Sequence, residues 1–461
     1  MHGGLAAHPT PLLGLVASLV LVQVGAALAP MLLAVIPSAR PPCGRRRGPG
    51  EVEFVVVTRA LPGVMPALRE VLERVSRGFP GYTLWVVTDD DSPGLPVLVE
   101  WKRGLGFRLV VVPSWYRRGR FKSRAIQYFI DYYVDEGKWY VFLDDDSYPL
   151  DDRFLCELDD SVPVYNGVIY PRRGRSLIAW LVDGSRYFHS ISRQRLALQL
   201  LHKPVYGLHG ELLIAKGWVL RRVPMASDSL VEDTLYAARL IRAGIPVGMV
   251  STRVSILSPN SVVDLWRQRA RWQLGVLRDM LRGLYPASLA AARGFDVFLW
   301  LLAPASPILW TYLAYLIAGS AVHLPAHLMA ALVLVAYSAA LVNHGLLAME
   351  TLGVARGAAL AAAGIYPVLL VYYGSPIYAL ANARSILSRF VIIDKASHQP
   401  REAPRAPPAP EAPGIPGGEG QPRPVRAPAV LASPEAPGAG ACCSARPPGS
   451  AMAEVQWRLL N

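Results

Sequence analysis

Cysteine is scarce in this sequence: the 461 residues include only Cys43, Cys156, Cys442 and Cys443. No pair of them is spaced with histidines as in a metal site, and nothing in their spacing indicates a disulfide framework. We therefore expect no cysteine-bound metal, and we expect a reducing compartment for the soluble part of the chain.

The sequence also lacks a basic patch with interleaved aromatic residues, although its net charge is +13. A nucleic-acid-binding surface requires such a patch, so we expect no nucleic acid among the partners. The charge instead suits a surface against anionic lipid, together with a pocket for phosphate groups. With 52% hydrophobic residues, the chain is too apolar for one soluble domain. This composition indicates a soluble domain combined with a few membrane segments.

A basic n-region is missing before the first apolar run, residues 11–37. The run is longer than the apolar part of a signal peptide and can cross a bilayer of about 30 Å. We predict a retained transmembrane helix within residues 1–38, followed by a basic linker at 39–50. Three consecutive arginines in this linker place it and the following domain in the cytoplasm, by the positive-inside rule. A bias toward arginine over lysine and few asparagines indicate a prokaryotic cell membrane.

Residues 51–285 alternate short β-branched runs with amphipathic stretches. This pattern predicts buried parallel strands at 51–58, 82–88, 107–112 and 138–143, with helices between them at 66–75 and 123–134. The fold class is therefore α/β, and ligands are expected at the carboxyl ends of the strands.

A second apolar region lies within residues 286–398. Transmembrane spans are predicted around 308–319 and 328–342. The stretch 357–383 is ambiguous, because it contains residues that would break a straight helix: Gly364, Pro367, Gly374 and Pro376. Residues 399–461 are rich in proline, alanine and glycine, and we expect this tail to be disordered.

Three aspartates, Asp144 to Asp146, directly follow the predicted strand 138–143. Alternate side chains of an extended chain point the same way, so Asp144 and Asp146 converge while Asp145 points elsewhere. Two such carboxylates suit Mg²⁺ or Mn²⁺ held jointly with a diphosphate. An acidic turn after a strand is the alternative reading.

A second acidic pair, Glu232 and Asp233, stands at the start of a predicted helix. Either Ser229 or Asp228 could cap this helix, and carboxylates are favoured in its first turn. Helix capping alone would explain the pattern. The functional reading is that one carboxylate acts as a general base for an incoming hydroxyl.

The segment RQRARW, residues 267–272, places Gln268, Arg271 and Trp272 on one face of a helix. An arginine fork can bind a diphosphate and a tryptophan can support a sugar ring. A basic helix at lipid headgroups is the alternative, and it suits Arg278 and Arg282 better than it suits a buried glutamine and tryptophan. Together with the two acidic centres, this segment predicts transfer of a sugar from a nucleotide diphosphate to a hydroxyl of a membrane-bound acceptor. A single displacement with a separate base inverts the anomeric centre.

The order of these motifs resembles the family 2 glycosyltransferases of the cellulose, chitin and hyaluronan synthase type. The matching motifs are VVTD at 86–89, DDD at 144–146, ED at 232–233 and QRARW at 268–272. Within that family, FKSRAIQY at 121–128, LLHKP at 200–204 and SPNSVVDLWRQRARW at 258–272 are similar to the egghead-type β-1,4-mannosyltransferases and their archaeal or other prokaryotic relatives. The resemblance implies a GT-A fold, Rossmann-like and typical of nucleotide-diphospho-sugar transferases, inserted between transmembrane helices.

The resemblance also implies a role for each matching residue. Thr58 and Asp89 would line the nucleoside pocket, and Lys122 would contact the diphosphate or ribose. Asp144 would touch the nucleotide-sugar and Asp146 would ligate the metal. Asp233 would be the base, positioned by Glu232. The diphosphate and the acceptor side would be bound by Gln268, Arg271, Trp272, His209 and Gly210.

Residues Phe390, Ile392 and Lys395 resemble the gating loop of the synthases, which closes over the nucleotide from the cytoplasm. The chain must then cross the membrane an even number of times after residue 290. We therefore expect 357–383 to be an interfacial or re-entrant helix, which leaves three true spans. Two departures from the family pattern are Glu211, where a small residue is common, and the missing acidic residue after the first strand.

Three spans are too few for the closed channel of a processive synthase, so the expected acceptor is linked to a lipid. By resemblance, the enzyme transfers mannose from GDP-mannose to a polyprenyl or dolichyl phosphate, or to a lipid-linked glycan, with Mn²⁺ or Mg²⁺. The principal alternative is a polysaccharide synthase that uses a UDP-sugar. A non-catalytic scaffold would be expected to lose a key carboxylate, but Asp144, Asp146 and Asp233 are all present.

Overall fold

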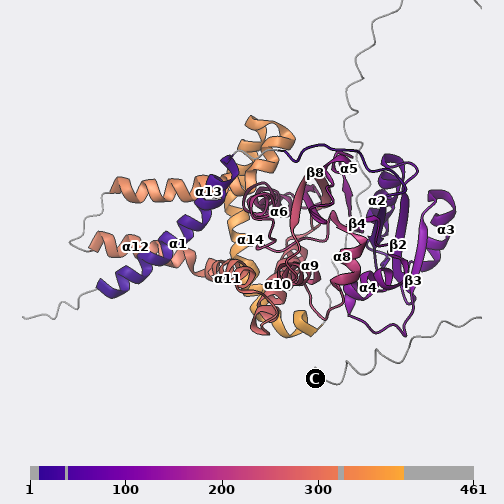
Figure 1. Cartoon of the computed structure of the whole chain (residues 1–461). Coiled ribbons are helices and arrows are strands. Elements are labelled where there is room, and N and C mark those ends of the chain that lie inside the picture. Colours follow the sequence, from indigo (N-terminus) through magenta and orange to yellow (C-terminus); the bar gives the residue numbers. More distant parts are fainter. Residues whose placement is uncertain (1–9, 37–39, 320–325, 389–461) are drawn as a thin grey trace, which may run out of the picture. The chain divides into compact units, whose positions relative to one another are not determined.

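An eight-stranded mixed sheet organises the region after the first helix (Figure 1). The computed structural model describes residues 10–36, 40–319 and 326–388. The strand order is β3-β2-β1-β4-β7-β6-β8-β5. The strands are β1 (Val52–Val57), β2 (Thr83–Asp89), β3 (Arg108–Val112), β4 (Trp139–Asp144), β5 (Ser147–Pro149), β6 (Val164–Arg172), β7 (Leu213–Lys216) and β8 (Val247–Leu257).

The predicted strands are confirmed as β1 to β4, and all of their mutual pairings are parallel. Every residue of β1 is buried, as expected for a parallel strand covered on both faces. Because side chains alternate along a strand, Phe54 packs into the core with helices α2, α3 and α5, whereas Val55 packs into the core with α4, α8 and α9. The predicted helices at 66–75 and 123–134 correspond to α2 and α4.

The other half of the sheet was not predicted from the sequence. Strand β7 pairs antiparallel with both β4 and β6, and β5 pairs antiparallel with β8. β7 has only four residues and β5 only three, so neither gives a readable hydrophobic period. The helices of this region are α2 (Met65–Gly78), α3 (Leu95–Leu105), α4 (Phe121–Tyr133), α5 (Phe154–Glu157), α6 (Leu177–His189), η1 (Ser190–Gln194), α7 (Arg195–Leu200), α8 (Gly217–Arg222), α9 (Glu232–Arg242) and α10 (Val262–Leu281).

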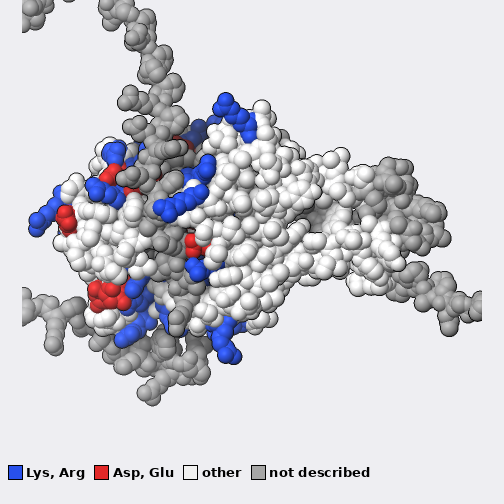
Figure 2. All heavy atoms as spheres, turned by 180° about the vertical axis from the view of Figure 1, so that it is seen from behind, with Lys and Arg blue, Asp and Glu red and all other residues white. Residues whose placement is uncertain are grey.

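Four segments of the described residues are long and apolar enough to cross a membrane: Gly14–Val35, Ala287–Tyr315, Ala330–Leu352 and Val354–Ser388. They are formed by α1 (Thr10–Val35), α11 (Ala287–Leu302) with η2 (Ala303–Ala305) and α12 (Ser306–Gly319), α13 (Ala326–Leu352) and α14 (Val354–Ser388). α1 contacts α12 and α13, and α14 packs against α13, α10 and α6 (Figure 1). Figure 2 shows that the charged side chains of the visible face gather over one part of it, while the remainder is uncharged. The chain therefore contains candidate membrane helices both before and after the sheet region in the sequence.

The expectation that 357–383 would be broken is wrong, because α14 is one continuous helix with Pro367 and Pro376 inside it. A proline in a helix leaves the carbonyl four residues earlier without its usual N–H partner. For Pro376 that carbonyl belongs to Tyr372, and the Ser375 hydroxyl donates to it at 3.0 Å. The indole N–H of Trp300 in turn donates to the Ser375 hydroxyl at 2.8 Å. The prediction that α14 lies at the interface and does not cross the membrane remains a prediction.

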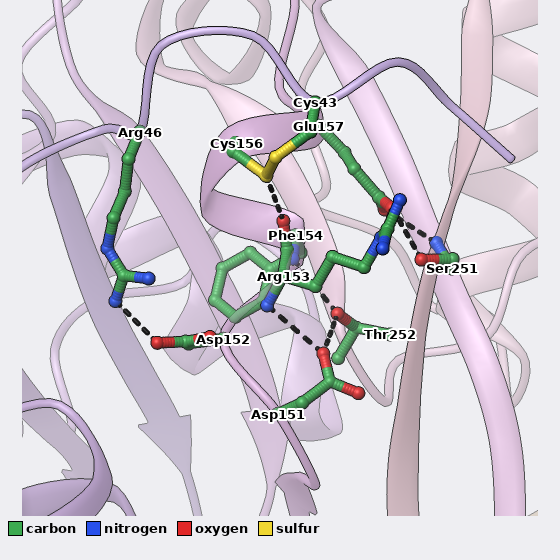
Figure 3. Close-up of a disulfide and its surroundings, with 10 residues drawn as sticks. All are labelled: Cys43, Arg46, Asp151, Asp152, Arg153, Phe154, Cys156, Glu157, Ser251 and Thr252. Atoms are coloured by element: carbon green, nitrogen blue, oxygen red, sulfur yellow. Dashed lines mark hydrogen bonds and ion pairs between the residues drawn. A yellow bond between two sulfur atoms is a disulfide. The ribbon is translucent and has the colours of Figure 1, made fainter.

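The expectation of no disulfide is also wrong, because Cys43 is bonded to Cys156 (Figure 3). Cys43 lies in the linker after α1, and Cys156 lies in the short helix α5. The backbone N–H of Gly44 donates to the carbonyl of Cys156 at 2.7 Å, and Arg46 pairs with Asp152 at 2.6 Å. The bonded cysteines are 113 residues apart, a separation that carries no signal in the sequence. We expected a reducing compartment because the spacing of the cysteines indicated no disulfide. The bond between Cys43 and Cys156 removes the reason for that expectation.

Candidate active site

A single cavity of about 1350 Å³ lies along the carboxyl ends of the parallel strands. Its lining includes every described residue that the sequence analysis selected: Thr58, Asp89, Lys122, Asp144, Asp146, His209, Gly210, Glu232, Asp233, Gln268, Arg271 and Trp272. The predicted loop residues Phe390 and Lys395 lie outside the described part of the chain. The structure thus brings together residues from strand ends, three helices and a loop that are far apart in the sequence.

The ends of β1, β2 and β4 supply the acidic side of the cavity. Val57, the last residue of β1, is in register with Asp144, the last residue of β4. Thr58 therefore lies beside the aspartate triplet, and its hydroxyl donates to Asp145 at 3.0 Å. Asp145 was expected to point elsewhere but lines the same cavity. The extended chain ends at Asp144 and residues 145 and 146 form a turn, so the alternation of a strand no longer applies.

Asp144 forms an ion pair with Lys122, which stands in the first turn of α4. Burial would lower the pKa of Lys122, but the carboxylates of Asp144 and Glu232 raise it above its usual value. Gly210 lies directly against this pair. A Cβ atom at Gly210 would lie 3.0 Å from the Lys122 ammonium and 3.2 Å from an Asp144 carboxylate oxygen. The loop therefore approaches the ion pair at a distance that only glycine permits without displacement of the pair.

Asp89, at the end of β2, is held by two arginines that the sequence analysis missed. Arg59 pairs with it at 2.6 Å and Arg124 pairs with it at 2.5 Å. Arg59 also pairs with Asp91 at 2.9 Å. Arg59 stands directly after Thr58 in the segment where the family pattern usually has an acidic residue. This departure from the family pattern was the signal in the sequence that could have identified Arg59. It places a positively charged side chain at this end of the cavity.

Asp146 is the second predicted metal ligand and is buried, with only 3% of its surface exposed. Its backbone carbonyl accepts a hydrogen bond from Arg172 at 2.8 Å, which fixes the turn after β4. Within the described residues, no three His, Cys, Asp or Glu side chains are grouped closely enough to hold a metal ion by themselves. A metal at Asp144 and Asp146 would therefore need further oxygen ligands from a substrate.

Glu232 and Asp233 occupy the first turn of α9, as expected. Burial raises the pKa of Glu232 to about 7, an effect that Lys122 opposes and Asp233 reinforces. Burial also raises the pKa of Asp233, assisted by Glu211, while the N–H of Thr234 donates to its carboxylate at 2.6 Å. Carboxyl groups with raised pKa values are suited to accept a proton near neutral pH.

The expected capping of α9 by Ser229 or Asp228 is wrong. The residue that precedes the helix is Val231, and no side chain caps it. The Ser229 hydroxyl instead donates to Asp279 and accepts a hydrogen bond from the N–H of Val231 at 3.0 Å. Asp228 pairs with Arg278 at 2.8 Å and with Arg282 at 2.9 Å. These two arginines therefore anchor α10 to the segment before α9, and neither of them lines the cavity.

The RQRARW segment contributes one turn of α10 to the cavity wall. Arg271 donates to the carbonyl of Leu230 at 3.1 Å, and burial lowers its pKa. Gln268 is buried, and its side-chain oxygen has no hydrogen-bond partner in the described structure. The guanidiniums of Arg186 and Arg269 lie over the ring of Trp272, at 4.9 and 4.7 Å from its centroid. The ring predicted to support a sugar is therefore already in contact with two cations.

The loop before β7 forms the predicted acceptor side. Asn166 accepts a hydrogen bond from the backbone N–H of His209 at 3.1 Å, and the ring of His209 lies 3.1 Å from the carbonyl of Gly167. Glu211 pairs with Arg186 at 2.7 Å. Burial would raise the pKa of Glu211, but Arg186 and His209 hold it well below its usual range. The unusual Glu211 is therefore a buried, ionised part of the wall.

Comparisons with known proteins identify the proteins to which this chain is similar. Residues 139–350 match the model of the glycosyl transferase family group 2. The chain is 26% identical to the β-1,4-mannosyltransferase egh of Drosophila melanogaster over 255 residues, which are 52% of this chain and 54% of that protein. It is 25% identical to the β-1,4-mannosyltransferase bre-3 of Caenorhabditis briggsae over 214 residues, 43% of this chain and 47% of that protein. The chain thus spans about half the length of the curated relatives it matches.

Among solved structures, the chain is similar to the mannosyltransferase PcManGT from Pyrobaculum calidifontis, determined in complex with GDP-Man and Mn²⁺. The sequence identity is 19% and the TM-score is 0.48, with 76% of this chain and 99% of that chain covered. A fragment of TarS from S. aureus is 13% identical, with a TM-score of 0.32 and coverage of 73% of this chain and 91% of that one.

Proposed function

We propose that this chain, which its match over residues 139–350 places among the family 2 glycosyltransferases, transfers mannose from GDP-mannose to a lipid-linked acceptor. One observation carries the proposal. The cavity that holds the acidic strand ends, the carboxylate pair of α9 and the arginine of α10 is also lined by residues of α1, α12, α13 and α14. A water-soluble donor and a membrane-bound acceptor can therefore meet in one space. Mannose as the transferred sugar is supported by the activities named for egh and bre-3.

The donor is proposed to bind along the strand ends. Thr58 and Asp89 would face the nucleoside, and Lys122 and Arg271 would face the diphosphate. The arginines beside Asp89 orient its carboxylate. The arginines in the linker after α1 favour the cytoplasmic side for this domain, where nucleotide-sugars are used. The Cys43–Cys156 disulfide would then form inside the cell, as disulfides do in hyperthermophilic prokaryotes.

A divalent metal fits the chemistry of the aspartate triplet. Asp144 and Asp146 offer hard carboxylate oxygens, which Mg²⁺ and Mn²⁺ prefer, and both line the cavity. Lys122 neutralises Asp144 in this structure. When the donor and the metal bind, the cation can replace Lys122 at Asp144, and the ammonium group of Lys122 can pair with the diphosphate. When bound, the metal would neutralise charge on the departing diphosphate.

The transfer itself is proposed to be one displacement with inversion. An acceptor hydroxyl oxygen bonds to the anomeric carbon of mannose, and the bond from that carbon to the diphosphate breaks. The electron pair leaves with GDP, and Asp233 takes the proton of the hydroxyl. Lys122 and Arg271 stabilise the charge that develops on the leaving group.

The test is GDP release by the purified full-length protein in detergent. GDP-mannose is supplied with Mn²⁺, with and without a polyprenyl-phosphate-linked acceptor. We expect release that requires the lipid and that falls by about 10²- to 10⁴-fold in Asp233→Asn, the usual contribution of a general base. The matched control is Asp228→Asn, which alters an aspartate of the preceding loop that pairs outside the cavity. UDP release from a UDP-sugar alone, with polymer formation, would contradict the proposal and favour a polysaccharide synthase.

A further inference from the structure

The cavity continues from the catalytic carboxylates into a second polar region, where α6, η1, α10, α11 and α13 contribute side chains. We call this region the junction pocket. It is defined by His189, Arg193, Gln273, Arg293, Asp296 and Asn343, all of which line the cavity. None of these residues belongs to the motifs that the sequence analysis selected.

The junction pocket holds an excess positive charge. Arg193 pairs with one oxygen of Asp296 at 2.5 Å, and Arg293 pairs with the other at 3.1 Å. Two guanidiniums thus share one carboxylate, and their side chains are only 20% and 17% exposed. A buried charge without a full counterion is costly, so this arrangement favours an anion between the two arginines.

Neighbouring acidic groups do not supply that anion. The other two arginines at this end of the cavity, Arg186 and Arg269, are matched by two carboxylates. Arg186 pairs with Glu211 at 2.7 Å, and Arg269 pairs with Asp183 at 2.6 Å. The positive excess at Arg193 and Arg293 therefore remains.

Several buried polar atoms of the junction pocket have no hydrogen-bond partner in the described part of the chain. They are the ring Nδ1 of His189, the guanidinium Nε of Arg293 and the side-chain oxygens of Gln273 and Asn343. Burial and the nearby Arg193 hold the pKa of His189 well below its usual value, so the ring is neutral and can donate one hydrogen bond. Both amides can also turn an NH₂ group toward a ligand. A set of donors with excess positive charge fits an oxyanion with several acceptor oxygens, such as a phosphate.

Beyond the junction pocket the cavity wall becomes apolar. Helices α1, α13 and α14 line it with aliphatic and aromatic side chains, among them Val24, Val333, Ala336, Ile365, Tyr366 and Leu369. A free phosphate ion gains nothing from such a wall, whereas a hydrocarbon chain gains the free energy of burying its surface. The combination therefore fits a phosphate that carries a long apolar chain.

On the opposite side, the junction pocket is linked to the acceptor loop. Gln194, the neighbour of Arg193, donates to Asn166 at 3.3 Å. Asn166 in turn accepts the backbone N–H of His209 at 3.1 Å. A group attached to a phosphate at Arg193 and Arg293 would extend toward this loop and the carboxylates of α9, which line the same cavity.

We propose that the junction pocket binds the phosphate or diphosphate of the lipid-linked acceptor, and that the apolar end of the cavity receives its hydrocarbon chain. This inference rests on the proposed function, because it assigns the acceptor of that reaction to a class of anionic lipids. Arg193 and Arg293 are the binding residues, and Asp296 holds them in place.

Equilibrium binding to the full-length protein in detergent tests the assignment. The probes are geranylgeranyl phosphate, geranylgeraniol and inorganic phosphate. We expect the lipid phosphate to bind about tenfold or more tightly than the alcohol, and Arg293→Gln to remove this difference, because one charge-assisted hydrogen bond contributes that much. Arg282→Gln, directly after the end of α10 and outside the cavity, is the matched control and should bind as the wild type does. Asp296→Asn removes the shared counterion and should tighten binding of the lipid phosphate.

Equal affinity for the phosphate and the alcohol, or equal affinity in Arg293→Gln and Arg282→Gln, would overturn the assignment. Inorganic phosphate that competes as well as the lipid phosphate would reassign the pocket to a free anion. Lipid-phosphate binding without GDP-mannose turnover would leave the inference standing and reject the proposed function. Mannosyl transfer with an acceptor KM that is unchanged in Arg293→Gln would support the proposed function and reject the inference.

Discussion

At the scale of single residues, the chemistry of the cavity depends most on Glu232. It stands between Lys122, which favours its ionised form, and Asp233, which disfavours it, and burial raises its pKa to about 7. Its protonation state therefore changes within the pH range in which the enzyme would work. The charge facing Lys122 and Asp233 changes with it.

This position predicts a pH dependence of the transfer reaction. Below pH 7 Glu232 is protonated and no longer balances Lys122, so kcat/KM should fall as the pH decreases through about 7. Glutamine is uncharged at every pH, so kcat/KM of Glu232→Gln should stay near the low value of the protonated enzyme, and the acidic limb near pH 7 should be lost. The measurement is the pH profile of kcat/KM between about pH 5 and 9, which extends about two units to either side of the pKa of Glu232. Glu73→Gln, on the exposed face of α2, is the control, and an unshifted limb in Glu232→Gln would reject this role.

Single residues also mark the limit of prediction from the sequence. Asp144, Asp146 and Asp233 could be selected because their positions follow from strand and helix ends. Asp145 was misread, since the sequence does not show where an extended chain begins to turn. Arg193 and Arg293 were missed because they belong to no short motif, and only the packing of α6, η1 and α11 brings them together around Asp296.

At the scale of elements, α14 shows how a helix accommodates proline. The carbonyl of Tyr372 is satisfied by the Ser375 hydroxyl, and this hydroxyl also accepts the indole N–H of Trp300 from α11. One side chain thus repairs the helix and joins it to its neighbour. Gly374 permits close packing in the same region. It lies against the ring of Trp266, and a Cβ atom at this position would come within 2.7 Å of that ring.

Ser375→Ala should therefore destabilise the protein. It leaves a part-buried carbonyl and a buried indole N–H without partners, and the buried group alone costs on the order of 2 kcal/mol when it is unsatisfied. Thermal unfolding in detergent would measure the loss. Ser388→Ala, which removes an exposed hydroxyl near the end of the same helix, should have no measurable effect. Equal melting temperatures for the Ser375→Ala and Ser388→Ala variants would contradict this account of α14.

The elements that could be predicted are those with a strong local pattern. Strands β1 to β4 consist of continuous β-branched and aromatic residues, so their number and parallel direction were accessible from the sequence, whereas their order in the sheet was not predicted. Strands β5 to β8 were not, because their pairing depends on contacts across long loops and two of them are very short. The continuity of α14 could not be predicted either. The backbone hydrogen bond that is lost at Pro376 is replaced by one from the side chain of Ser375, which the sequence does not reveal.

At the scale of the whole molecule, the disulfide ties the linker after α1 to the edge of the sheet (Figure 3). The closed loop contains strands β1 to β5 and the helices α2, α3 and α4 between them. Cross-linking a loop of this size reduces the entropy of the unfolded chain, which stabilises the fold by roughly 5 kcal/mol in the chain-entropy model. The linker is also held by the Arg46–Asp152 pair, so the disulfide is not its sole attachment.

Reduction of this bond should lower the melting temperature by on the order of ten degrees. Cys43→Ser and Cys156→Ser should each have the same effect, and reductant should then cause no further change. A Cys442→Ser, Cys443→Ser double variant should respond to reductant as the wild type does. An identical melting temperature for the reduced and oxidised wild type would show that the bond does not form in solution.

The cavity that joins the strand ends to the apolar faces of α1, α13 and α14 has a practical consequence. Any alkyl chain that enters its apolar end occupies the space of an acceptor tail, and the detergent used to extract the protein carries such a chain. The detergent is therefore a competing ligand as well as a solvent. Acceptor kinetics in micelles will follow surface dilution, so that rates depend on the mole fraction of acceptor among amphiphiles and not on its bulk concentration. Long-chain and bulky detergents will give different apparent affinities for the same acceptor, whereas affinity for the nucleotide will stay constant.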